Sequence, residues 1–338
     1  MPCYSPWVGY YDKGVGRVFY VGKTEGREPL NEALEIWKNS ARTSSWKPEN
    51  MMLLPCGKCL GCRLEYSKEW ANRCALEAKT TQNNWFMTLT YDEEHIKECL
   101  KPVIDKETGE YGHIESLMPN HLSKFIKEIR RNTEYHKKQQ GVRFYGCGEY
   151  GSRGGRPHYH LLMYNLPLDD LAEEWKKDGF ITFSSENVSR IWGKGIVTIN
   201  EFSWETAAYT ARYMLKKLKG RDAKEQYKGA GIEPEFSRCS RRPGIAYDYY
   251  QQNRDKIYQT DSIIIHGTTC KPPTYFDRMF KEECPDRWAE IQEQRAEVSR
   301  NEMRMKLNNT TLNYRDQLKV EEANREDKIK LLGRQLEY

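Results

Sequence analysis

The sequence predicts an α+β protein with a central antiparallel sheet, helices on one sheet face and a metal site on the other. The aromatic and β-branched run Trp85–Tyr91 predicts a strand, as do Val142–Glu149 and His158–Tyr164. Apolar residues three and four positions apart predict amphipathic helices over Leu64–Thr80 and His121–Arg131. Because strands and helices alternate along one continuous stretch, we expect them to share one sheet domain.

The remaining elements and the domain limits follow from the same patterns and from shifts in composition. We expect a short strand at Arg17–Val21, helices at Asn31–Ser40, Asp169–Lys177, Glu186–Trp192 and Trp204–Lys219, and a strand at Ile196–Asn200. Residues 1–63 are predicted to form an irregular N-terminal region with a cysteine cluster, and residues 64–280 the sheet domain. Residues 281–338 are predicted to form a charged tail, helical or partly disordered.

The charge balance of the chain allows a nucleic-acid partner but does not require one. The 338 residues contain 54 Lys and Arg and 49 Asp and Glu, which gives a net charge of +5. The predicted tail is almost neutral, so the excess lies in the first 280 residues. No apolar run approaches the ~20 residues of a membrane span, and the first residues lack the pattern of a signal peptide. We therefore expect a protein of the cytoplasm.

The motif His158-Tyr159-His160 predicts a metal site. Alternate side chains of a strand share a face, so the two imidazoles project together, about 6–7 Å apart. If Tyr150–Pro157 closes a hairpin, Glu149 becomes the cross-strand neighbour of His158. Two nitrogens and one carboxylate with open positions suit Mg²⁺ or Mn²⁺ acting on a phosphodiester, whereas a closed zinc site would use four ligands. The alternative is a pair of solvent-facing histidines.

A basic helix carries two tyrosines. Tyr209 and Tyr213 are four residues apart, so both phenols lie on one helix face. Lys216 and Lys217 follow, and the helix is basic enough to meet a phosphate backbone. The alternative is an ordinary aromatic packing pair. Beside a metal-bound phosphate, a tyrosine would act as a nucleophile and leave a 5′-phosphotyrosine and a free 3′-OH, with either lysine favouring the phenolate.

These motifs in this order resemble the HUH endonucleases that use two catalytic tyrosines. The strand Phe86–Tyr91 is similar to the family's first motif. Pro55–Arg63 and Phe236–Ile245 also resemble segments of the replication initiators of gokushovirus-type microviruses. The resemblance covers roughly residues 55–280. It implies rolling-circle initiation, in which the two tyrosines alternate in cutting and rejoining single-stranded DNA at a replication origin.

Cys56, Cys59 and Cys62 have metal-like spacing but supply only three thiolates of a tetrahedral zinc site. Cys3 would complete the site if the N-terminal segment folds back, and Cys74 is a second choice for the fourth ligand. The alternative is a set of reduced thiols without metal. A zinc ion here would be structural or would help to hold DNA, away from the nicking centre.

Alternatives to the phage initiator remain at this stage. An HUH transposase or a plasmid relaxase would use the same chemistry. A non-catalytic protein that binds or packages single-stranded DNA would use the tyrosines for base stacking. The chain has no Gly-x-x-x-x-Gly-Lys-[Ser/Thr] motif. A nicking enzyme of this kind would therefore depend on a separate host helicase to unwind the duplex. We also expect a host DNA polymerase as a partner, and we expect the protein to act in the cytoplasm of the bacterial host.

Overall fold

The computed structural model divides the chain into two compact units. One contains residues 67–280 and the other contains residues 1–66 together with 281–338. The described residues are 3–12, 17–23, 51–104, 109–137, 141–151, 154–177, 180–216, 227, 229–312 and 314–333. The domain limits at residues 63 and 280 stay predictions.

A seven-stranded antiparallel sheet forms the centre of the larger unit, as predicted. Its strands lie in the order β12-β7-β8-β4-β11-β10-β9. In chain order they are β4 (Trp85–Leu89), β7 (Arg143–Tyr150), β8 (Pro157–Tyr164), β9 (Leu171–Lys177), β10 (Phe180–Ser185), β11 (Val197–Glu201) and β12 (Phe236–Cys239). The central position of β8 explains its sequence, because a strand covered on both faces needs apolar side chains at nearly every position.

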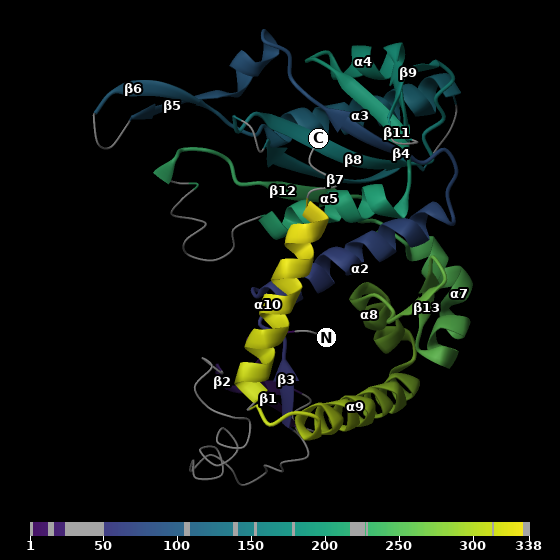
Figure 1. The fold of residues 1–338 in the computed structure, drawn as a ribbon. Coiled ribbons are helices and arrows are strands. Elements are labelled where there is room, and N and C mark those ends of the chain that lie inside the picture. The colour runs from purple at the N-terminus through teal and green to yellow at the C-terminus, as the bar shows by residue number, and fades with distance from the viewer. Residues whose placement is uncertain are drawn as a thin grey trace. The chain divides into compact units, whose positions relative to one another are not determined.

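Helices pack on both faces of this sheet (Figure 1). The helices α3 (Pro119–Lys137) and α4 (Glu186–Trp192) cover the face of Tyr159, Leu161 and Met163. The helices α2 (Leu60–Ala78) and α5 (Trp204–Lys216) contribute Cys74 and Ala207 to a smaller core on the opposite face, with Leu162 and Tyr164. The sequence predicted helices on one face only, but the structure also has helices on the face that holds the predicted metal ligands.

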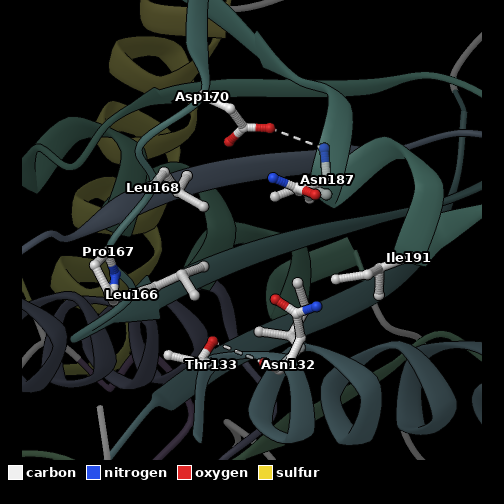
Figure 2. A pocket seen from close by; sticks show the side chains of 10 residues that line it. Asn132, Thr133, Leu166, Pro167, Leu168, Asp170, Asn187 and Ile191 are labelled. Carbon is white, nitrogen blue, oxygen red and sulfur yellow. Dashed lines mark hydrogen bonds between the residues drawn. The ribbon is translucent and has the colours of Figure 1, made fainter. Parts of the chain in front are cut away.

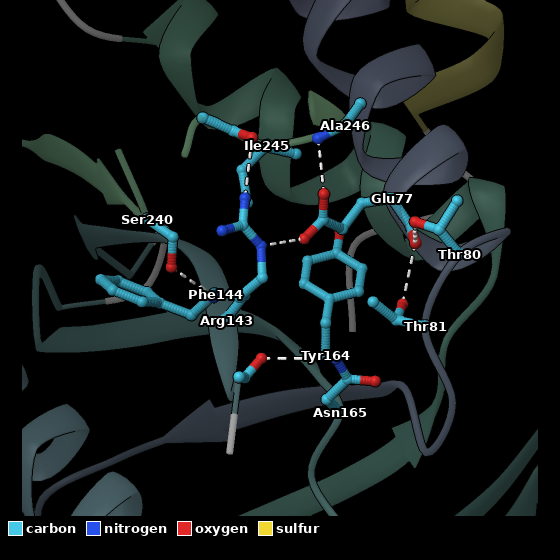
Figure 3. Close-up of polar contacts among 12 residues, drawn as sticks. Glu77, Thr80, Thr81, Arg143, Phe144, Tyr164, Asn165, Ser240, Ile245 and Ala246 are labelled. Carbon is cyan, nitrogen blue, oxygen red and sulfur yellow. Dashed lines mark hydrogen bonds and ion pairs between the residues drawn. The ribbon is translucent and has the colours of Figure 1, made fainter. Parts of the chain in front are cut away.

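A buried ion pair ties α2 to the sheet (Figure 3). The Arg143 guanidinium contacts the Glu77 carboxylate, which is 1% exposed, and donates to the Gly244 carbonyl at 2.7 Å. The second oxygen of Glu77 accepts from the Ala246 amide. Because a buried charge is tolerated only when it is paired, this network fixes the loop after β12 against α2 and β7.

The remaining elements of the larger unit surround the sheet. They are η2 (His95–Cys99), the hairpin β5 (Leu100–Ile104) and β6 (Tyr111–Glu115), α7 (Tyr247–Thr260), the hairpin β13 (Ile263–Ile265) and β14 (Thr268–Cys270), and α8 (Thr274–Glu283).

The predicted helix over Asp169–Lys177 is wrong, because Leu171–Lys177 forms the edge strand β9. Its residues include Ala, Glu and Lys, which favour helices. Pairing with β10 over six registered positions overrides that preference. Most of β9 is exposed, so no alternation of apolar and polar residues marks it as a strand.

The smaller unit combines a three-stranded sheet with two long helices. Its strands are β1 (Trp7–Asp12), β2 (Arg17–Lys23) and β3 (Met51–Leu54), and its helices are α9 (Pro285–Asn308) and α10 (Tyr314–Gly333). The helical tail and the strand near Arg17 are confirmed, whereas the helix predicted at Asn31–Ser40 lies outside the described residues. Among the helices that the structure describes, none has the length and apolarity needed to cross a bilayer.

Candidate functional site

The predicted hairpin between β7 and β8 brings the three candidate metal ligands together. The strands pair in continuous register, with Glu149 opposite His158 and Cys147 opposite His160. Because residues two apart share a face, Glu149, His158 and His160 point to the same side of the sheet. One ligand atom of each residue lies within 4.8 Å of the others.

Glu149 is the centre of this cluster. Its Oε1 lies 2.6 Å from His158 Nε2 and 3.1 Å from His160 Nε2. The Glu149 side chain is almost completely buried. Burial raises the pKa of this carboxyl, but hydrogen bonds and charge interactions with the two histidines outweigh it, so its pKa is lowered. The group is therefore a carboxylate at neutral pH, as a metal ligand must be.

The cluster also has the features expected of a site that receives a cation. Within the described part of the chain, Glu149 Oε2 is buried and has no hydrogen-bond partner. A buried carboxylate oxygen without a partner is costly, and a bound cation would remove that cost. The residues present therefore fit a divalent ion.

The outer ring nitrogens of the two histidines have their own contacts. His158 Nδ1 lies 3.1 Å from the Arg156 carbonyl, to which it donates. His160 Nδ1 lies 3.0 Å from Thr88 Oγ1 on the neighbouring strand β4. Contacts of this kind orient metal-binding imidazoles and leave Nε2 available to coordinate a metal ion.

Tyr209 lies next to this cluster. Its ring is 5.3 Å from the His160 ring, edge to face, and 6.1 Å from the Phe86 ring. Helix α5 buries Ala207, Thr210 and Ala211, which share one side of the helix, and Tyr209 is only half-buried beside them. This packing explains the sequence pattern, since small side chains allow the helix to approach the sheet closely.

The structure covers the rest of the predicted tyrosine helix only in part. Tyr213 and Lys216 belong to α5, but their side chains lie outside the described part of the structure. Lys217 lies outside the described residues altogether. The roles assigned to these three residues stay predictions.

The predicted cysteine cluster converges within the smaller unit. The sulfur atoms of Cys3, Cys56, Cys59 and Cys62 lie within 4.8 Å of one another. Cys74, the second choice for a fourth ligand, is instead fully buried in the core of the sheet domain.

A pocket at the sheet face opposite the metal cluster offers no comparable chemistry. It is lined by side chains of α3, α4 and the segment after β8 (Figure 2). Its single carboxylate, Asp170, accepts hydrogen bonds from Ser185 Oγ at 2.8 Å and from the Asn187 amide at 2.9 Å. Asp170 therefore holds the beginning of α4 in place.

Comparisons with known proteins identify the family. The model of the family "Replication-associated protein ORF2/G2P" matches residues 84–218. The replication-associated protein ORF2 of Spiroplasma virus 4 is 36% identical over 291 residues, which cover 84% of this chain and 85% of that protein. The chain belongs to this family of phage replication-associated proteins. The resemblance to initiators of the gokushovirus type is thereby confirmed.

More distant phage members of the family match as well. The replication-associated protein VP4 of Bdellovibrio phage phiMH2K is 28% identical over 70% of each chain. The replication-associated protein ORF4 of Chlamydia phage 1 is 25% identical over 68% of this chain and 53% of that protein. No solved structure matches the chain significantly. The region of the family model includes Glu149, His158, His160 and Tyr209.

Sequence reasoning did not find the contacts that the Thr88 hydroxyl and the Arg156 carbonyl make with the two histidines. Thr88 lies in a strand that was predicted, but its contact with His160 depends on the pairing of β4 with β8. Strand periodicity alone does not give that pairing.

Proposed function

We propose that this chain is a metal-dependent endonuclease that nicks and rejoins one DNA strand to initiate rolling-circle replication of phage DNA. The observation that carries the proposal is the cluster of Glu149, His158 and His160 beside the Tyr209 ring. The carboxylate and two imidazoles can bind a divalent ion, and the phenol beside them can act as the nucleophile, which together are the parts needed for metal-assisted phosphoryl transfer to tyrosine. The names of the related phage proteins, which associate them with replication, support the role in phage replication.

The tyrosine supplies the nucleophile. Tyr209 loses its phenolic proton, its oxygen bonds to the scissile phosphorus, and the bond from phosphorus to the 3′ oxygen breaks. The products are a 5′-phosphotyrosine and a 3′ oxygen that takes up a proton. Since a phenol has a pKa of about 10, the reaction needs a positive charge that favours the phenolate, and we assign this role to Lys216 or Lys217.

Glu149, His158 and His160 would hold Mg²⁺ or Mn²⁺, and the bound ion would polarise the phosphate and stabilise charge on the leaving oxygen. Arg156 and Thr88 keep the two imidazoles oriented for this task through their contacts with Nδ1.

Tyr213 is proposed as the second nucleophile. Replication must end with a second cut while the first 5′ end is still esterified to the first tyrosine. A residue one helical turn away meets this need, because both phenols then approach the same site. The 3′-OH released by the second cut attacks the first phosphotyrosine and closes the circle.

The proposed partners are single-stranded DNA and the replication origin. We also propose that a host helicase opens the duplex and a host DNA polymerase extends the 3′-OH, in the cytoplasm of the bacterial host. The absence of a nucleotide-binding loop motif from the sequence supports the dependence on a separate helicase.

The test is to incubate the full chain with Mn²⁺ and labelled single-stranded phage DNA and to look for a covalent adduct under denaturing conditions. We expect an adduct that disappears with a chelator and with the double change of Tyr209 and Tyr213 to Phe. Replacement of the exposed Tyr111 by Phe is the matched control and should leave the adduct unchanged. Tight DNA binding without any adduct would favour the DNA-binding or packaging protein instead.

A further inference from the structure

Four cysteines from two distant segments meet at one end of the small sheet. The strands β1 and β3 pair antiparallel, with Trp7 opposite Leu54 as their last pair. Cys3 lies just before β1 and Cys56 just after β3, so both lie beyond the same end of the ladder. The helix α2 begins at Leu60, with Cys59 directly before it and Cys62 in its first turn.

The separations of the sulfur atoms match a tetrahedral metal site. Cys56 Sγ lies 3.9 Å from Cys62 Sγ, and Cys59 Sγ lies 3.9 Å from Cys3 Sγ. Zinc–sulfur bonds of about 2.3 Å arranged as a tetrahedron place the sulfurs about 3.8 Å apart. A disulfide would require about 2 Å, and all four cysteines are free thiols in the structure.

Backbone amides point at the sulfurs of this cluster. Cys56 Sγ accepts from the amides of Lys58 at 3.4 Å and Cys59 at 3.3 Å. Gly57 makes this turn with φ of +71°, a value that favours glycine. Donors to sulfur stabilise the thiolate, and the thiolate is the form that binds a metal.

The other two contacts join the N-terminal segment to the rest of the cluster. Cys3 Sγ accepts from the Cys56 amide at 3.3 Å, and Cys59 Sγ accepts from the Tyr4 amide at 3.3 Å. The two segments are more than 50 residues apart in the sequence, yet each supplies an amide to a sulfur of the other. The sulfurs are therefore held in place by the backbone itself.

We propose that Cys3, Cys56, Cys59 and Cys62 bind one structural Zn²⁺ ion that joins the segment before β1 to the start of α2. Four thiolates fill a tetrahedral zinc ion completely and leave no position for water or substrate, so the site supports the fold and takes no part in DNA cleavage. The positive end of α2 next to the cluster favours the anionic sulfurs.

The site differs in chemistry from the cluster at Glu149. Thiolates select zinc or iron–sulfur centres, whereas a carboxylate with two imidazoles suits harder divalent ions such as Mn²⁺. The two sites should therefore bind different metals in the same preparation. Loss of zinc and loss of nicking can then be measured separately, so failure of one proposal does not imply failure of the other.

The experiment is elemental analysis of the full chain purified under reducing conditions without added metal. We expect about one zinc ion per chain, and protection of these four thiols from alkylation until a chelator is added. Substitution by Co²⁺ should give the visible absorption of a tetrahedral tetrathiolate centre. Iron with sulfide in place of zinc would overturn the proposal, as would purified protein that carries no zinc and whose four thiols alkylate rapidly before any chelator is added.

Single substitutions test which thiols bind the ion. Cys59→Ser should lower zinc affinity by more than about 100-fold, because even the loss of a partner outside the metal shell costs 10–100-fold. Cys284→Ser is the matched control, since this half-exposed cysteine lies outside the cluster. The Cys284→Ser protein should retain its zinc ion. Equal zinc content in both variants would contradict the assignment. If Cys59→Ser fails to fold, the zinc content and alkylation pattern of the unchanged protein still decide.

Discussion

Thr88→Val tests whether the contacts around the histidines matter for metal binding. Valine keeps the shape and strand preference of threonine but removes the hydroxyl that lies 3.0 Å from His160 Nδ1. Loss of one such hydrogen bond costs about 0.5–1.5 kcal/mol of folding stability. Loss of a partner that orients a metal-binding imidazole costs about 10–100-fold in metal affinity. The effect on metal binding should therefore exceed the effect on stability.

The assay is Mn²⁺ titration by calorimetry, together with adduct formation at a subsaturating metal concentration. Thr88→Ser keeps the hydroxyl and should retain most of the affinity. Thr198→Val is the matched control, because Thr198 pairs with Thr88 across β11 and β4, one strand further from His160. If Thr88→Val binds Mn²⁺ as tightly as Thr198→Val does, the orienting role of Thr88 is refuted.

Three further predictions concern the ligands, the tyrosines and pH. Glu149→Gln should lower Mn²⁺ affinity by more than about 10-fold while binding to single-stranded DNA, measured by anisotropy, stays unchanged, because phosphate contacts supply most of that affinity. Tyr209→Phe and Tyr213→Phe should each still form an adduct on a short oligonucleotide but should release no closed circles in a replication assay. Burial and the nearby Lys194 lower the pKa of His121, so the folded chain should lose stability as pH falls below about 6.5, where the unfolded chain gains protons first. Denaturant unfolding should show a weaker decline for His121→Gln, and an identical decline would contradict this account.

Much of the sheet could be predicted because its central strands have strong local signals. The run Trp85–Leu89 and the segment Pro157–Tyr164 are rich in aromatic and apolar residues, which favour buried strands. The edge strand β9 escaped prediction because its exposed side chains leave no pattern. Its strand form depends on its neighbour β10.

The candidate metal site was predictable for a different reason. Glu149, His158 and His160 lie close together in sequence, and a single hairpin with a regular register determines their arrangement. The proximity of Tyr209 to His160 depends on how α5 packs on the sheet, which local spacing does not determine. The same holds for Cys3, whose approach to Cys56 requires the pairing of β1 with β3.

The most direct test of the central claim is to identify the residue that carries DNA after reaction with Mn²⁺, by mass spectrometry of the digested adduct. We expect a nucleotide linked through a 5′ phosphate to Tyr209 or Tyr213, and no such peptide when the metal is removed. An adduct on any other residue would contradict the account, as would strand cleavage that leaves no covalent adduct.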